Sequence, residues 1–364
     1  MRITAFIYTI ISVGRIIQHN LYGDYQMNKK MIAIALIVVL VVAGLGIGLS
    51  VNNDKDKTGP ITVTDGSGTV FTFEKPCERV IVYSKYIAEA MILMGVSDLV
   101  VGTTSTVIND TNYSSYYTNA TDLGTKTTTG MDIVLTLNAD VIISYNSNDN
   151  TQLVNTGIPV VEIGAAKSSE VIDDITTLGK ILGKETEAQK ILDWYEPYYN
   201  VVTKGGSSET TFALESASKT KLTFCNPTST PGALLETAGG TNVFTTTSTT
   251  YTYPEGATLI ELNPDVIMVV TYNSSWNTES LDAYLQTIYG RSGWDNIAAV
   301  QNGDVYMISN DIVGGIRSVI GAMFMLSFID SAYEDVNVSD LVDEYNAIAG
   351  TDFKNMVVYT GSTA

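Results

Sequence analysis

One pattern of apolar and polar positions occurs twice in the chain, about 125 residues apart. Residues 137–142 read Leu-Asn-Ala-Asp-Val-Ile and continue into Ile-Ser-Tyr-Asn-Ser, whereas residues 262–267 read Leu-Asn-Pro-Asp-Val-Ile and continue to Tyr-Asn-Ser. Each copy follows an apolar stretch with helical spacing, at 131–137 and 257–262. The pattern therefore predicts helix, short turn, buried strand and polar loop in both copies. Because open α/β sheets bind ligands at the carboxyl ends of their strands, we expect two similar lobes with a ligand in the cleft between them.

The rest of the pattern predicts alternating strands and helices on either side of one long helix. A β-hairpin is expected at 61–73 around a Gly-rich turn, and strands are expected at 79–82, 99–101, 157–161, 221–224 and 305–308. Helices are expected at 86–94, 168–182, 185–202, near Leu234, and at 281–288, 317–329 and 339–348, the last with Ser339 as its cap. Pro197 predicts a kink or an early end near Tyr195 in the long helix.

These elements divide the chain into segments. We expect an N-terminal lobe at 61–183, a connecting helix at 184–204, a C-terminal lobe at 205–350 that opens with the strand at 221–224, and a tail at 351–364.

The front of the chain has the composition of a membrane anchor. Residues 32–51 carry no charge, and these 20 residues are long enough to cross a hydrocarbon core of about 30 Å. Lys29 and Lys30 precede the run and mark the cytoplasmic side, so the body lies on the extracytoplasmic face of the cell membrane. The run exceeds the apolar core of a secretory signal and has no clear Ala-x-Ala ending, which favours an uncleaved anchor at 27–52 over a signal segment. Residues 1–26 are interpreted as an over-long start before Met27, and residues 53–60 as a linker.

Charge and cysteine usage narrow the class of protein. The net charge of −19 argues against nucleic acid, whose binding needs clustered Lys and Arg; it suits an acidic extracellular surface or plain solubility equally well. The two cysteines, Cys77 and Cys225, fall at opposite ends of their predicted strands, so we expect two free, buried thiols rather than a disulfide.

Histidine is informative because the body of the chain lacks it. The single histidine, His19, precedes the apolar run, which excludes a His-ligated haem, a His-based zinc site and a Ser-His-Asp triad in the body. The body has no GxxxxGK[ST] phosphate loop either. A paired-carboxylate hydrolase remains as the enzymatic alternative, but no Asp or Glu spacing proposes a pair, so no catalytic residue is predicted.

Several short motifs, taken in order, resemble those of ABC-transporter substrate-binding proteins for iron–siderophore complexes, haem and cobalamin. The resemblance covers about residues 61–350. The matching motifs are Asp-Gly-Ser-Gly at 65–68, Pro76 with Arg-Val-Ile at 79–81, Glu89, Met-Gly at 94–95, Leu-Val-Val-Gly at 99–102, Gly-Ile-Pro-Val-Val at 157–161, Leu-Gly-Lys-Ile-Leu-Gly at 178–183, Gly-Gly-Thr-Asn-Val at 239–243, the second repeat at 262–267, Trp294, and residues 299–306.

The resemblance implies two Rossmann-like lobes joined by a single long helix, with the ligand between them and no catalysis. It implies that the loaded protein, as a monomer, docks on a membrane permease with its ATPase. Members of the family pair a Glu on each lobe with permease arginines, and Asp149 and Glu279 are the candidates here because they lie just beyond the Tyr-Asn-Ser loops.

Ligand contacts are expected from the loops that follow the strands. In the first lobe these are Tyr83, Ser84, Lys85, Tyr86, Thr104, Tyr145 and Asn146. In the second lobe they are Asn226, Tyr251, Tyr272, Asn273, Trp276 and Arg317, the last because similar proteins often carry an Arg there. The alternatives stay open: loop tyrosines can be packing residues, Lys85 can be solvated, and Arg317 can pair with a nearby carboxylate.

The chemistry of these residues points to a metal chelate. Tyrosine faces stack on planar macrocycles or catechol rings, and their hydroxyls bind carboxylates and amides. Lys85 and Arg317 would favour anionic groups, so a ferric siderophore is preferred, with cobalamin or a Tyr-ligated haem as alternatives. No cofactor is expected, because the metal arrives inside its chelate. The rival hypothesis is a surface receptor or adhesion protein that uses the same fold without a permease.

Overall fold

The computed structural model describes residues 59–125, 131–145, 152–206, 208–217, 221–272, 277–350 and 358–359. In this part of the chain no helix is both long and apolar enough to cross a membrane. The anchor predicted at residues 32–51 lies outside the described residues.

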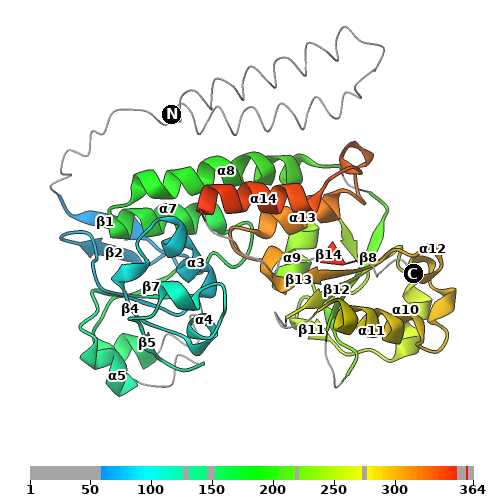
Figure 1. Ribbon diagram of the computed structural model, residues 1–364, viewed down its shortest axis with the longest axis horizontal. Coiled ribbons are helices and arrows are strands. Elements are labelled where there is room, and N and C mark those ends of the chain that lie inside the picture. Colours follow the sequence, from blue (N-terminus) through cyan, green and yellow to red (C-terminus); the bar gives the residue numbers. More distant parts are fainter. Residues whose placement is uncertain are drawn as a thin grey trace, which may run out of the picture. The chain divides into compact units, whose positions relative to one another are not determined.

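A five-stranded parallel sheet forms the core of the first lobe, with strand order β5-β4-β3-β6-β7. Its strands β4, β5 and β7 are labelled in Figure 1. Its strands are β3 Val80–Val82, β4 Val100–Thr103, β5 Thr121–Asp122, β6 Val141–Ser144 and β7 Val160–Glu162. Its helices are α3 Lys85–Leu93, α4 Ser105–Ile108, α5 Met131–Thr136 and α7 Val171–Leu182, with short 3-10 helices η1 Ser97–Leu99, η2 Ser114–Tyr116 and η3 Val154–Thr156. The predicted hairpin is confirmed as the antiparallel pair β1 Ile61–Thr64 and β2 Val70–Phe73.

A seven-stranded mixed sheet forms the core of the second lobe, with strand order β11-β9-β8-β12-β13-β14 and with β10 paired to β8. Its strands are β8 Thr211–Ser216, β9 Phe224–Cys225, β10 Thr241–Asn242, β11 Tyr251–Thr252, β12 Val266–Thr271, β13 Val305–Ser309 and β14 Val358–Tyr359. Its helices are α9 Thr230–Thr237, α10 Gly256–Leu262, α11 Thr278–Tyr289, α12 Ala298–Asn302, α13 Ser318–Leu326 and α14 Val338–Ala349, with 3-10 helices η4 Trp294–Asn296, η5 Asn310–Ile312 and η6 Ser331–Tyr333. The central strands β8, β12 and β13 are parallel, so their carboxyl ends meet at one edge of the sheet.

The predicted repeat forms the same structure in both lobes. The first copy gives α5 and β6, and the second gives α10 and β12. The turn between helix and strand contains Asn138 with φ 48° in the first copy and Asn263 with φ 43° in the second, a left-handed conformation that asparagine tolerates better than most residues. All positions of β6 and β12 are buried, as expected for parallel strands covered on both faces.

A single helix, α8 Glu185–Lys204, connects the two lobes. Its 20 residues span about 30 Å, and it packs against α7 of the first lobe and α13 of the second (Figure 1). The predicted early end near Tyr195 is wrong, because the helix continues through Pro197 to Lys204. Tyr195 is buried on this helix and donates a hydrogen bond to the carbonyl oxygen of Ser168 at 2.8 Å.

The first strand of the second lobe lies earlier in the chain than predicted. This strand is β8 rather than a strand at 221–224, and Phe224–Cys225 forms the antiparallel strand β9. Glu215 lies buried within β8 and forms two hydrogen bonds with Arg291, at 2.6 and 2.7 Å. A charged residue within a strand interrupts the hydrophobic pattern by which strands are predicted. Glu215 is compatible with burial because Arg291, far away in the sequence, neutralises its charge, so the pattern did not predict β8.

Two smaller predictions also have outcomes. The final helix is capped by Asn337 rather than Ser339: the side-chain oxygen of Asn337 accepts the N–H of Ser339 at 3.0 Å. The two cysteines are free and buried, as predicted.

Candidate functional site

A cavity of about 400 Å³ lies between the two lobes, at the carboxyl ends of their parallel strands. Tyr83 follows β3, Tyr145 follows β6, Tyr272 follows β12 and Asn310 follows β13. The described residues that line this cavity are Tyr83, Ser84, Lys85, Tyr86, Thr104, Thr106, Thr125, Tyr145, Ala166, Thr228, Ser229, Thr230, Pro231, Thr250, Tyr251, Tyr272 and Asn310. The cavity therefore lies where the repeat predicted a ligand site.

Eight of the predicted ligand residues line this cavity. They are Tyr83, Ser84, Lys85, Tyr86, Thr104, Tyr145, Tyr251 and Tyr272. Asn226 and Arg317 do not line it, and Asn146, Asn273 and Trp276 lie outside the described residues. Of the two residues predicted to dock on a permease, Glu279 is exposed in the first turn of α11, whereas Asp149 lies outside the described residues.

Several lining residues were not predicted. Asn310 follows β13, so the same strand-end rule that selected Tyr272 could have found it. Thr230 and Pro231 begin α9, whose cap Ser229 accepts the N–H of Gly232 at 3.0 Å. The Ser-Thr-Pro sequence at 229–231 is a recognisable helix start, and this signal could have placed the first turn of α9 beside the cavity.

Tyrosines dominate the aromatic lining. The side chains of Tyr145 and Tyr272 occupy equivalent positions in the two repeats and stay 57% and 47% exposed. Tyr83 is only 4% exposed, and its hydroxyl has no hydrogen-bond partner within the described chain. Burial raises the pKa of Tyr83 to about 12, so its hydroxyl is protonated at neutral pH and can donate a hydrogen bond.

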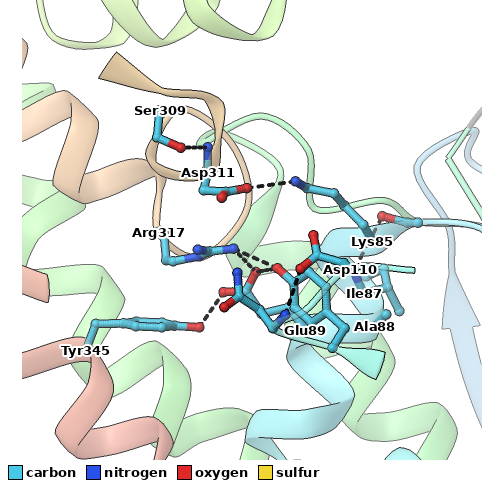
Figure 2. Close-up of polar contacts among 12 residues, drawn as sticks. Lys85, Ile87, Ala88, Glu89, Asp110, Ser309, Asp311, Arg317 and Tyr345 are labelled. Atoms are coloured by element: carbon cyan, nitrogen blue, oxygen red, sulfur yellow. Dashed lines mark hydrogen bonds and ion pairs between the residues drawn. The ribbon is translucent and has the colours of Figure 1, made fainter. Parts of the chain in front are cut away.

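Lys85 is the one charged residue among the described lining residues, and it is already paired. Lys85 begins α3 after its cap Ser84, whose hydroxyl donates to the carbonyl oxygen of Gly164 at 2.7 Å. The Nζ of Lys85 lies 2.9 Å from Oδ1 of Asp311, in η5 of the second lobe (Figure 2). Lys85, which the sequence predicted to bind an anionic ligand, therefore forms an ion pair with Asp311 across the cleft.

A second cavity, of about 250 Å³, adjoins the first and shares four of its lining residues. The shared residues are Lys85, Thr106, Tyr272 and Asn310, and the additional ones are Asn109, Asp110, Thr271, Ser309 and Asp311. Its described lining thus contains two carboxylates and one ammonium group. The two cavities together form a polar, hydroxyl-rich cleft.

Arg317 lies in a buried cluster behind the cleft. Its Nη2 lies 2.7 Å from Oε2 of Glu89 (Figure 2). The same nitrogen lies 2.7 Å from the hydroxyl of Tyr113. Tyr113 and Tyr345 also donate to the Glu89 carboxylate, and the side chains of Glu89 and Arg317 are each 1% exposed. The sequence analysis left open that Arg317 pairs with a carboxylate instead of contacting the ligand, and the structure shows this pairing. The ion pair with Glu89 connects the second lobe to α3.

Asn226 supports a loop that carries a lining tyrosine. Its side-chain NH₂ donates to the carbonyl oxygen of Thr249 at 2.9 Å, and its side-chain oxygen accepts from the hydroxyl of Thr252 at 2.7 Å. These bonds hold the segment on either side of Tyr251, so Asn226 positions the cavity wall without lining it.

The cleft does not gather metal ligands in the described part of the chain: no group of three His, Cys, Asp or Glu side chains there could hold a metal ion. Its lining offers hydrogen-bonding groups and aromatic rings, which suit an organic ligand.

The chain was compared with known protein sequences and solved structures. Cobalamin-binding proteins from two strains of Halobacterium salinarum are 25% identical over 264 residues, covering 69% of this chain and 67% of theirs. The TroA-like periplasmic binding protein FepB from Veillonella parvula has a TM-score of 0.71 at 20% identity, covering 83% of this chain and all of that chain. An ABC transporter solute-binding protein from Sulfurospirillum deleyianum has a TM-score of 0.66 at 18% identity, covering 81% of this chain and 97% of that chain.

These two structures share the fold, and the predicted resemblance to ABC-transporter substrate-binding proteins is confirmed. The periplasmic binding protein profile matches residues 80–312, which extend from β3 of the first lobe to η5 of the second. Since this match covers well over half of the chain, the protein belongs to the periplasmic binding protein family.

Proposed function

We propose that this protein is the extracytoplasmic solute-binding component of an ABC importer and captures an uncharged metal chelate in the cleft. The observation that carries the proposal is the cavity of about 400 Å³ lined from both lobes at the ends of their strands. Its volume falls in the range of about 300 to 1,000 Å³ that is typical of small-molecule sites.

The charge of the cleft favours an uncharged chelate. The sequence suggested Lys85 and Arg317 as cations for an anionic siderophore, but Asp311 pairs with the first and Glu89 with the second. What remains towards the ligand in the larger cavity is mainly a set of tyrosine rings and hydroxyl groups. Together with the cobalamin-binding relatives, this supports a corrinoid as the first candidate. A ferric siderophore whose complex is uncharged is the second, because the tyrosine hydroxyls suit its carbonyl oxygens.

The aromatic residues suggest how the chelate is held. The exposed rings of Tyr145 and Tyr272 supply a face from each lobe, on which a planar group can pack. The buried hydroxyl of Tyr83 supplies a donor for an amide or carboxyl oxygen. In this proposal the metal arrives within the ligand, and the protein contributes contacts to its organic shell.

Delivery requires a membrane and a permease. We propose that residues 27–52 anchor the protein, which acts as a monomer, and that Asp149 and Glu279 pair with permease arginines. The competing proposal of a surface receptor without a permease predicts that no ATPase or permease co-purifies with the full-length chain from its native membrane.

Isothermal titration calorimetry of the purified full-length chain tests the choice of ligand. We would titrate cobalamin, an uncharged ferric trihydroxamate, an anionic ferric tricatecholate and haem in parallel. Sub-micromolar, saturable binding of cobalamin or the trihydroxamate is expected. Preference for the tricatecholate would contradict the uncharged-chelate proposal, and silence from all four would contradict the chelate proposal altogether.

A further inference from the structure

We propose that Asp311 is a built-in counter-ion for Lys85 and that this pair selects uncharged chelates against anionic ones. The inference deepens the proposed function and rests on it. It assigns a specificity role to Asp311, a residue that the sequence patterns did not single out.

The geometry places the pair where a ligand would meet it. Lys85 lines both cavities, and its Nζ reaches across the cleft to Oδ1 of Asp311 at 2.9 Å (Figure 2). The two side chains retain 20% and 12% exposure, so they remain accessible from the cleft. The backbone N–H of Asp311 donates to the hydroxyl of Ser309 at 3.1 Å, which holds the start of η5 and fixes the carboxylate in position.

Both partners are charged at neutral pH. Burial by itself would raise the pKa of Asp311, but nearby Arg317 and Lys85 outweigh burial and lower it. Burial likewise disfavours the charged form of Lys85, but Asp311 outweighs burial and raises the pKa of the ammonium group. The ion pair therefore persists over the whole neutral range, and an anionic ligand finds Lys85 already neutralised.

Displacing Asp311 would be costly for an anionic ligand. A carboxylate that loses its partner in a partly buried site keeps its desolvation penalty without the compensating attraction. Asp110 and Asp311 both line the smaller of the two cavities. Burial raises the pKa of Asp110, and the negative charge of Asp311 raises it further. The two carboxylates would repel an incoming anion. Arg317 offers no substitute, because Glu89 binds it behind the cleft.

Two variants that break the same ion pair in opposite senses test this inference. Asp311→Asn leaves an ammonium group without its carboxylate, whereas Lys85→Gln leaves a carboxylate without its ammonium group. For the full-length wild type and both variants, calorimetry gives the ratio of affinity for a ferric tricatecholate to affinity for an uncharged ferric trihydroxamate. We expect this ratio to rise about tenfold in Asp311→Asn, equivalent to about 1.4 kcal/mol, and not to rise in Lys85→Gln.

Each other outcome is decisive. An unchanged ratio in Asp311→Asn, or an equal rise in both variants, would overturn the inference, because loosened lobes rather than an unmasked cation would then set the preference. A wild type that prefers the tricatecholate would overturn it as well. If the wild type binds neither chelate, a ferric siderophore is ruled out as the ligand in the proposed function. The inference about Asp311 still requires that Asp311→Asn binds the tricatecholate more tightly than the wild type does. If Asp311→Asn shows no binding of the tricatecholate, the inference is overturned independently of the proposed function.

Discussion

Asp140 and Asp265 occupy equivalent positions in the two lobes, and each accepts two hydrogen bonds from the start of a neighbouring strand. Oδ2 of Asp140 accepts the backbone N–H groups of Glu78 and Arg79 at 2.8 and 2.9 Å, just before β3. Oδ2 of Asp265 accepts the backbone N–H and the hydroxyl of Thr211 at 2.8 and 2.7 Å, at the start of β8. Asp140 also donates its own N–H to the carbonyl oxygen of Arg79, and Asp265 donates its own to that of Thr211. The aspartate of the repeat thus ties two strands together at their amino ends, opposite to the cavity.

Because these aspartates lie at the far ends of the strands, their loss should affect stability and not binding. We expect Asp140→Ala and Asp265→Ala each to lower the free energy of unfolding by about 1 kcal/mol, as the loss of a capping carboxylate does. Denaturant unfolding checks the size of the change. The matched variants Asp140→Asn and Asp265→Asn keep an acceptor oxygen and should lose less. A large drop in chelate affinity with either alanine variant would contradict this separation of roles.

The Glu89–Arg317 pair should be much more costly to break. Both side chains are 1% exposed, and the pair joins α3 to the turn that begins α13. Arg317→Met leaves a buried carboxylate without its cation, so we expect a loss of about 3 to 5 kcal/mol in unfolding free energy.

The double variant Glu89→Gln with Arg317→Met provides the control, because it removes both charges. It should be more stable than Arg317→Met alone, as measured by the same denaturant unfolding. If the double variant is less stable than the single one, the charge of Glu89 is not the source of the cost.

The sequence predicted the parts of the site that depend on local position along a strand. Tyr145 and Tyr272 were found because each follows the buried strand of a repeat, and Tyr83 because it follows β3. The partners in the ion pairs were not found. Lys85 and Asp311 are separated by 226 positions and Glu89 and Arg317 by 228, so no spacing rule connects them.

The same reason explains the errors in the fold. Strand β8 was missed because Glu215 interrupts its apolar pattern, and its partner Arg291 follows 76 positions later. Such a carboxylate becomes compatible with a buried strand only in the folded chain. Local patterns therefore predicted the layout of strands and helices, whereas the charge of the cleft depended on contacts between distant residues.

Removal of the tyrosine lining should weaken binding without unfolding the protein. We expect Tyr83→Ala with Tyr272→Ala to lower chelate affinity at least about tenfold, or about 1.4 kcal/mol, because a donor and a stacking face are lost together. Calorimetry with the best-bound chelate measures the change. Tyr253→Ala is the matched control: Tyr253 is also an exposed tyrosine of the second lobe, but it contacts Lys221 and does not line the cavity. Equal affinities of the double variant and the control would move the site away from these strand ends.

The buried thiols should make the protein lose stability at alkaline pH. Burial, followed by the charge of Asp140, raises the pKa of Cys77 from 9.0 to about 12, and burial raises the pKa of Cys225 from 9.0 to about 11. Between pH 9 and these values the unfolded chain releases the protons that the folded chain keeps. The free energy of unfolding must therefore fall as pH rises, whereas below pH 9 the thiols contribute no slope.

Cys77→Ala isolates one of these contributions, because it removes a thiol that titrates only when the chain unfolds. Denaturant unfolding at intervals from pH 8 to pH 11 should show a shallower decline for Cys77→Ala than for the wild type, with parallel curves below pH 9. Lys75→Gln is the control, since Lys75 is exposed nearby and affects the pKa of Cys77 less than burial or Asp140 does. If Cys77→Ala declines as steeply as the wild type, then Cys77 ionises in the folded chain as readily as in the unfolded one, and its burial does not protect the proton.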